Sequence, residues 1–178
     1  MSDSSSGSGG RQFVSGLGAS MFGTPEMAAV FSDAARVRRM LEVEAALARA
    51  QAAVGILPAE AAEAIARACE DADIDAESLH REAAAAGTLA IPLVARLTDL
   101  VPEDARGWVH RGATSQDIVD TATVLQARDG LDALVEHVGA LGDACAVHAR
   151  RYRDTPMVAR TLLQHAAPTT FGLTAARW

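Results

Sequence analysis

The fold is decided by one long stretch, SQDIVDTATVLQARDGLDALVEHVGALGDACAVHARR, which covers residues 115–151. Apolar residues recur in it at intervals of three or four, with one six-residue step: Ile118, Ala122, Leu125, Leu131, Leu134, Val138, Leu141 and Cys145. This spacing predicts an α-helix, starting at Thr114 or Ser115, with an apolar stripe along one side. At 1.5 Å per residue the helix would extend roughly 50 Å, so it needs a bundle of other helices to pack against.

The segments before this stretch contain helix start and stop signals. Thr24 before Pro25 predicts one helix start, and Ser32 predicts another for a segment that ends at about Val54, before Gly55. Further helices are expected over residues 58–71 and 75–86, and after Pro92 within residues 90–102. Beyond the long stretch, we expect a break at Pro156, a last helix near residues 167–178, and no strand.

These segments together predict an all-α fold in two parts. Residues 20–113 would form an N-terminal helical domain, and residues 114–178 the start of a central helical bundle that continues in a longer protein. Residues 1–19 are rich in serine and glycine, which predicts a disordered or tag-like tail.

Composition narrows the class of function. The chain has 49% hydrophobic but only 4% aromatic residues, and much of the apolar share is alanine, which favours helices. A net charge of −7 argues against nucleic acid as a partner. The sequence has no apolar run long enough for a membrane span and no leader pattern. Cys69 and Cys145 lack metal-site spacing, so we expect reduced cysteines in a cytoplasmic protein.

A first polar cluster, HRGATSQD at residues 110–117, precedes the long helix. Thr114 and Asp117 have the spacing of a capping box, which would only start the helix. A helix N-terminus also favours an anion, because its free N–H groups and dipole point outward. His110, Arg111 and the hydroxyls of Thr114 and Ser115 would add donors for a carboxylate or phosphate. The two interpretations are compatible, and both stay open.

A second polar cluster, ARTLLQHAAPTTFG at residues 159–172, contains His165. A lone histidine in an apolar stretch is more often structural than catalytic, but Arg160, Thr161 and Gln164 stand close to it in sequence. Histidine is also the side chain best suited to exchange protons near neutral pH. The histidines at positions 80, 137 and 148 are expected on helix surfaces, and Glu42 and Glu44 are expected to be ion-paired or solvated.

Together the two clusters resemble the fumarase/aspartase superfamily. The resemblance rests on HRGATSQDIVDTA (110–122), RTLLQHAAPTTFGL (160–173), LAIPLVARL (89–97) and the lead-in at 31–58, and it covers about residues 20–178. Within the superfamily the chain is most similar to the 3-carboxy-cis,cis-muconate cycloisomerases, on Gln116 and the LAIPLV segment, and next to the adenylosuccinate lyases.

The resemblance implies an enzyme of known architecture. Members are longer proteins with three helical domains, and they assemble as homotetramers whose active sites combine residues from three subunits. It implies a small polycarboxylate substrate, catalysis by His165, and substrate contacts from the following residues: His110, Arg111, Thr114, Ser115, Gln116, Thr161 and Gln164. It implies no metal and no organic cofactor.

One family motif has no counterpart in these residues. The flexible SSxMPxKxN-like loop, which carries the catalytic serine base in the family, is absent. We therefore expect the chain alone to be inactive. The alternatives are an adenylosuccinate lyase-type enzyme that catalyses β-elimination, and a non-catalytic helical module that self-associates.

Overall fold

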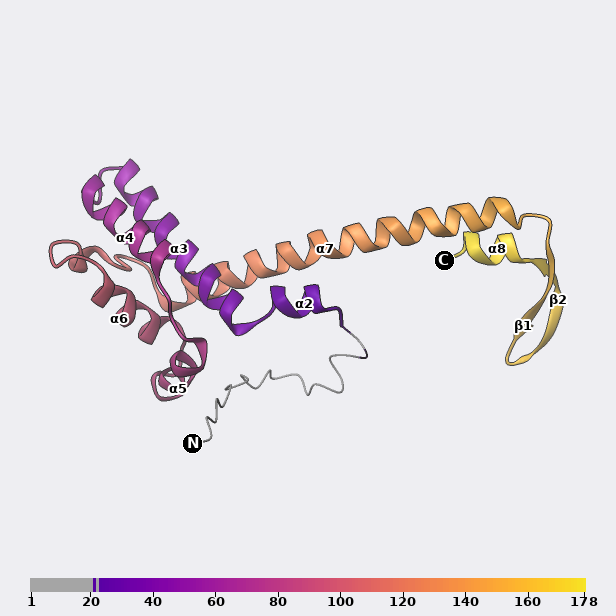
Figure 1. Cartoon of the computed structure of the whole chain (residues 1–178), viewed down its shortest axis with the longest axis horizontal. Helices are drawn as coiled ribbons and strands as arrows, with labels where there is room; N and C mark the ends of the chain where they lie inside the picture. The colour runs from indigo at the N-terminus through magenta and orange to yellow at the C-terminus, as the bar shows by residue number, and fades with distance from the viewer. Residues whose placement is uncertain (1–20, 22) are drawn as a thin grey trace, which may run out of the picture. The chain divides into compact units, whose positions relative to one another are not determined.

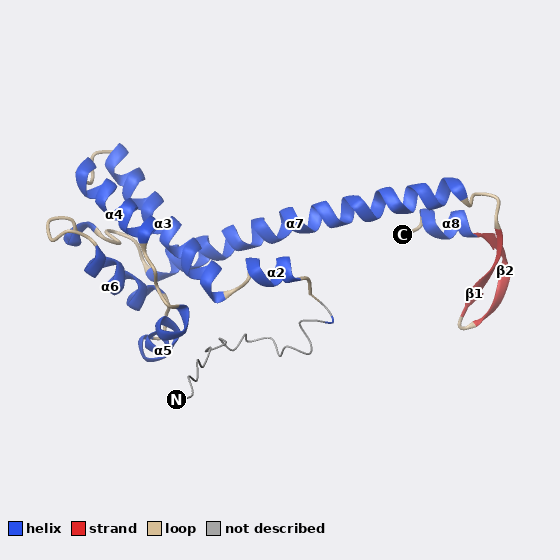
Figure 2. Ribbon diagram, in the orientation of Figure 1, coloured by secondary structure: helices blue, strands red, loops and turns tan. Residues whose placement is uncertain are grey.

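The computed structural model describes residue 21 and residues 23–178, so the tail expected at residues 1–19 lies outside the described residues. Figures 1 and 2 show the helices, with one hairpin near the C-terminus. The elements, in chain order, are α2 (Pro25–Val30), α3 (Asp33–Ala53), α4 (Ala59–Asp71), α5 (Ala76–Ala86), α6 (Ala90–Leu100), the 3-10 turn η1 (Arg106–Trp108), α7 (Ser115–Arg151), β1 (Pro156–Thr161), β2 (Gln164–Thr170) and α8 (Phe171–Ala176). The chain divides into two compact units between Gly130 and Leu131.

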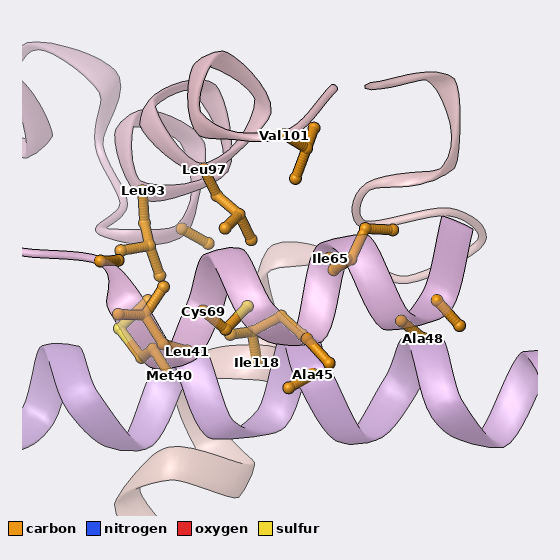
Figure 3. Close-up of a cluster of buried hydrophobic side chains, with 14 of the residues drawn as sticks. Met40, Leu41, Ala45, Ala48, Ile65, Cys69, Leu93, Leu97, Val101 and Ile118 are labelled. Carbon is orange, nitrogen blue, oxygen red and sulfur yellow. The ribbon is translucent and has the colours of Figure 1, made fainter. Parts of the chain in front are cut away.

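The first unit has an aliphatic core between α3, α4, α6 and the start of α7 (Figure 3). Met40 and Leu41 of α3 are at most 1% exposed, and Ile118 of α7 is 1% exposed. Many of the remaining core positions are alanines, which allow the helices to approach closely. The core therefore anchors the first turns of α7, the helix whose N-terminus was predicted to bind an anion.

Most helix boundaries follow the predicted signals. The Thr24 hydroxyl accepts a hydrogen bond from the Met27 amide at 3.1 Å, and the Ser32 hydroxyl accepts one from Ala35 at 3.2 Å. Gly87 ends α5 in the left-handed conformation, at φ 76°. The long helix α7 covers Ser115–Arg151, as expected. The hydroxyls accept hydrogen bonds from free N–H groups of the first turn, and the glycine adopts the conformation that ends a helix. Because both effects are local, the sequence could predict these boundaries.

The expected start of the helix near Pro92 was wrong. Helix α6 begins at Ala90 rather than after Pro92. Pro92 lies in the first turn, where backbone N–H groups have no partner within the helix, so the missing N–H of proline costs no helical hydrogen bond.

The second unit corrects the expectation of no strand. Residues 156–170 form an antiparallel hairpin in which β1 pairs with β2, from Pro156 opposite Thr170 to Thr161 opposite Gln164, with an irregularity between Val158 and Arg160. The last helix is correspondingly short and begins at Phe171. Helices still form most of the described chain, so the fold class is all-α with a small two-stranded addition.

Backbone contacts fix the hairpin to α7 and α8 within this unit. Phe171 N–H donates to the Thr155 carbonyl at 3.0 Å, and Gly172 N–H donates to the Tyr152 carbonyl at 2.9 Å. The rings of Tyr152 and Phe171 meet edge to face, with their centroids 5.2 Å apart. The base of the hairpin is therefore well defined, whereas its tip residues Leu162 and Leu163 are 93% and 94% exposed.

The apolar stripe of α7 is buried near the start of the helix and exposed farther along it. Its buried residues are Ile118, Ala122, Gln126 and Gly130. Beyond them, four stripe residues are about half exposed: Leu131, Leu134, Val138 and Leu141. Within the described residues, no helix is both long and apolar enough to cross a membrane.

Candidate functional site

The first candidate cluster surrounds the N-terminus of α7. Thr114 N–H donates to the Asp117 carboxylate at 2.9 Å, which is one half of the predicted capping box. The reciprocal bond is different, because the Asp117 amide donates to the Thr114 carbonyl at 3.0 Å rather than to its hydroxyl. Among the described residues the hydroxyls of Thr114 and Ser115 have no hydrogen-bond partner. They stand at the positive end of a long helix, where an anion is favoured.

The loop before α7 has an unusual backbone. His110 has φ 55° and Gly112 has φ 72°, both in the left-handed region. Glycine adopts that region without strain, whereas histidine does so only where neighbouring contacts hold it. Two contacts of this kind come from α3.

The first contact joins His110 to Glu44 of α3. The Nδ1 atom of His110 lies 2.6 Å from Oε1 of Glu44, and the two side chains are 19% and 1% exposed. Burial is the largest cause and raises the pKa of Glu44 above its usual value, although the hydrogen bond to His110 and its Coulombic interaction act in the opposite direction. Sequence reasoning expected Glu44 to be ion-paired or solvated. The ion pair is confirmed, but the sequence did not predict that Glu44 is buried or that its partner is His110.

The second contact joins Gln51 of α3 to the loop backbone. Its Nε2 donates to the Arg111 carbonyl at 2.6 Å. The Arg111 guanidinium is exposed and lies over the Trp108 ring, 4.6 Å from its centroid. The structure thus places His110, Arg111, Thr114 and Ser115 on one short segment held by α3.

Gln116, also predicted as a substrate contact, is exposed on the first turn of α7. Its Nε2 donates to Oδ1 of Asp120 at 2.7 Å. A substrate would therefore have to compete with this bond for the amide. Glu42, by contrast, forms the expected exposed ion pair, with Arg39 at 2.6 Å.

The second candidate cluster lies on the hairpin of the other compact unit. Thr161 and Gln164 are register partners that flank the tip, and His165 is paired with Arg160. All four side chains are exposed. Thr161, Gln164 and His165 therefore lie at the tip end of the hairpin, with Thr161 and Gln164 in one register pair and His165 in the next pair, with Arg160.

Neither the cavities nor the acidic, histidine and cysteine side chains of the described residues suggest another site in place of these two clusters. A cavity of about 580 Å³ is lined by residues of α3 and α5 and of the turn after α5, including Arg36, His80 and Thr88, but by none of the predicted site residues. In residues 21 and 23–178, no group of three or more His, Cys, Asp or Glu side chains is placed to hold a metal ion.

Known proteins match this chain over most of its length. A family model described as lyase matches residues 19–178. The 3-carboxy-cis,cis-muconate cycloisomerase of Pseudomonas putida is 46% identical over 155 residues, which are 85% of this chain and 37% of that protein. The nitrosuccinate lyase of Streptomyces davaonensis is 44% identical over 159 residues, 88% of this chain and 33% of that protein.

A solved structure is similar to this chain in both fold and sequence. The beta-carboxy-cis,cis-muconate cycloisomerase from Acinetobacter calcoaceticus sp. ADP1 matches with a TM-score of 0.87 and 45% identity. The match covers 91% of this chain and 39% of that one. The chain thus spans little more than a third of the length of these relatives.

Proposed function

Because this chain belongs to the lyase family of the fumarase/aspartase superfamily, we propose that it is the N-terminal part of a 3-carboxy-cis,cis-muconate cycloisomerase. The observation that carries the proposal is the 46% identity to the Pseudomonas putida enzyme across 85% of the chain. The whole protein would interconvert 3-carboxy-cis,cis-muconate and carboxymuconolactone during protocatechuate degradation in the cytoplasm.

The reaction adds a substrate carboxylate oxygen across a carbon–carbon double bond, and a proton is added to the neighbouring carbon. Its reverse is a β-elimination. Negative charge develops on a second carboxylate in the intermediate, so fixed donors aimed at that group supply much of the rate. The hydroxyls of Thr114 and Ser115 at the N-terminus of α7 suit this task, and His110 and Arg111 would help to neutralise the tricarboxylate.

His165 is proposed as the general acid/base, or as the hydrogen-bond partner of the reacting oxygen. Its exposure on the hairpin supports this role, because a catalytic ring must reach the substrate. Thr161 and Gln164, on the same end of the hairpin, would orient the substrate. Gln116 would contact it after releasing Asp120. We propose that the functional unit is a homo-oligomer, a tetramer for the whole protein.

The test is ultraviolet turnover of 3-carboxy-cis,cis-muconate by the full-length gene product that contains residues 1–178. His165→Ala should lower turnover by roughly two to four orders of magnitude, the range for a lost general acid or base. His80→Ala, at an exposed position of α5, is the control and should be near wild type. Full turnover in His165→Ala would refute the assigned role.

Two alternatives have distinct outcomes in the same experiment. The high identity to a nitrosuccinate lyase favours, as second candidate, an enzyme that cleaves by β-elimination, such as an adenylosuccinate lyase. Cleavage of succinyl-nucleotide without lactonisation would identify it. The third candidate is a non-catalytic helical module. It predicts that neither substrate reacts, and that the native gene product ends near residue 178.

A further inference from the structure

Glu44 is a buried carboxylate that the proposed mechanism does not use. It lies at 1% exposure on α3, among the aliphatic core residues, and its one ion-pair partner in the described chain is His110. A carboxylate in such a place is costly unless a donor compensates it. When Glu44 is ionised its carboxylate can only accept, so the Nδ1–H of His110 is then the donor, and this hydrogen bond fixes the orientation of the ring.

The geometry of α3 adds a second point of attachment. Gln51 follows Glu44 by seven residues, two helical turns, and therefore projects from the same side of α3. Gln51 is not one of the core residues, and its Nε2 donates to the Arg111 carbonyl at 2.6 Å. Glu44 and Gln51 together hold consecutive residues of the loop in which His110 has φ 55°. A histidine retained at positive φ indicates that these contacts outweigh local strain.

The other ring nitrogen of His110 has no hydrogen-bond partner among the described residues. We propose that Glu44 is a positioning residue: it holds His110 by Nδ1, so that Nε2 is presented to a substrate carboxylate, and with Gln51 it fixes the loop that leads into α7. The inference rests on the proposed function, because it uses the same substrate site. A role confined to stability would leave the His110 ring and the kinetics of the folded enzyme unchanged.

The test compares three variants that differ in what they leave at the contact. Glu44→Gln keeps an oxygen acceptor without charge, whereas Glu44→Ala removes the acceptor. Glu42→Gln is the matched control, since it neutralises an exposed carboxylate on the same helix that contacts Arg39 and not the loop.

The first readout needs no substrate. In the ¹⁵N-labelled 178-residue chain, the Nδ1–H signal of His110 should be protected from solvent exchange in the wild type and in Glu42→Gln. It should weaken in Glu44→Gln and vanish in Glu44→Ala, while the loop amides at residues 110–113 become more mobile. An unchanged ring signal and unchanged loop amides in a folded Glu44→Ala protein would overturn the proposal.

The second readout is kinetic, in the full-length gene product. Glu44→Ala should lower kcat/KM roughly ten- to a hundredfold, as for the loss of a hydrogen bond to a charged group, with partial rescue in Glu44→Gln. A kcat/KM in Glu44→Ala equal to that of Glu42→Gln would overturn the positioning role. If the wild type does not act on 3-carboxy-cis,cis-muconate, the proposed function fails, and the ring and loop signals alone decide the proposal.

Discussion

At the scale of single residues, the two cysteines are predicted to differ sharply in reactivity. Burial is the main cause that raises the pKa of the Cys69 thiol to about 12, and the nearby Glu44 carboxylate adds to it. Cys145 is only half-buried. Because the thiolate is the reactive form, iodoacetamide at pH 8 should alkylate Cys145 first, and Cys69 only after unfolding in urea. Peptide mass spectrometry measures both sites, and equal native labelling would contradict the prediction.

Glu44 shows where residue-level prediction stops. Its charged neighbours in the sequence suggested a solvated or ion-paired helix face, since local charge patterns describe how a helix meets water. The burial of Glu44, at 1% exposure, depends instead on how sequence-distant elements of the first unit pack together. His110 was predicted as a site residue from its motif, but its partner, 66 positions away, has no local signal. The available hint is the spacing of Glu44, four residues after Met40 and four before Ala48, which are both buried on α3.

At the scale of elements, alanine substitutions at two glycines of the second unit are predicted to have opposite effects on its stability. A Cβ at Gly172 would lie 2.6 Å from the Ala149 carbonyl oxygen and 2.7 Å from Arg153 Cα, both backbone atoms that cannot move aside. Gly172→Ala should therefore displace α8 from the end of α7. Gly139, within α7, has nothing within 4 Å of the added atom, so Gly139→Ala should stabilise the helix by about 1 kcal/mol.

Amide hydrogen exchange distinguishes these outcomes. Gly172→Ala should lose protection at the amides of Phe171 and Gly172, which donate to Thr155 and Tyr152. Gly139→Ala should keep that protection and exchange more slowly along α7. Wild-type protection in Gly172→Ala would show that the contact between α7 and α8 is looser than described.

The N-terminus of α5 is predicted to depend on pH. The Asp75 carboxylate accepts from the Ser78 amide at 2.9 Å, and this backbone hydrogen bond is the main cause that lowers the pKa of Asp75. A lowered folded-state pKa stabilises the fold above the unfolded value of 3.8, and that stabilisation is lost as the pH falls through the folded value. In urea, the free energy of unfolding should therefore be higher for the wild type than for Asp75→Asn at pH 7, and the two values should approach each other near pH 2. A constant difference at both pH values would contradict it.

Among the elements, the starts of several helices could be predicted from the sequence, whereas the hairpin could not. Helix starts at Thr24, Ser32 and Asp75 follow from side chains that bond their own first turn, so a local pattern is enough. The hairpin was missed because its tip is Leu162–Leu163, at φ 47° and 62°, where two-residue turns usually have asparagine or glycine. Its strands are exposed on both sides, so no apolar alternation marks them.

At the scale of the whole molecule, the exposed part of the α7 stripe supports the proposed homo-oligomer. The stripe was predicted from sequence spacing, and it is buried up to Gly130 by the first unit. Leu131, Leu134, Val138 and Leu141 then remain about half exposed, although their spacing is that of a packed helix face. Contiguous exposed apolar residues of this kind are typical of surfaces that another protein covers. The proposed homo-oligomer would cover them with α7 of other copies.

Val138→Glu tests this assembly, because Val138 belongs to the stripe and is 56% exposed. A carboxylate buried between copies, together with the lost apolar contact, should weaken self-association about tenfold or more. Ala140→Glu is the control, since position 140 lies off the stripe and adds the same charge. Sedimentation equilibrium over a range of protein concentrations measures both, with circular dichroism to confirm equal helix content. Equal weakening by the two variants would point to net charge, and no weakening by either would show that the stripe is not the interface.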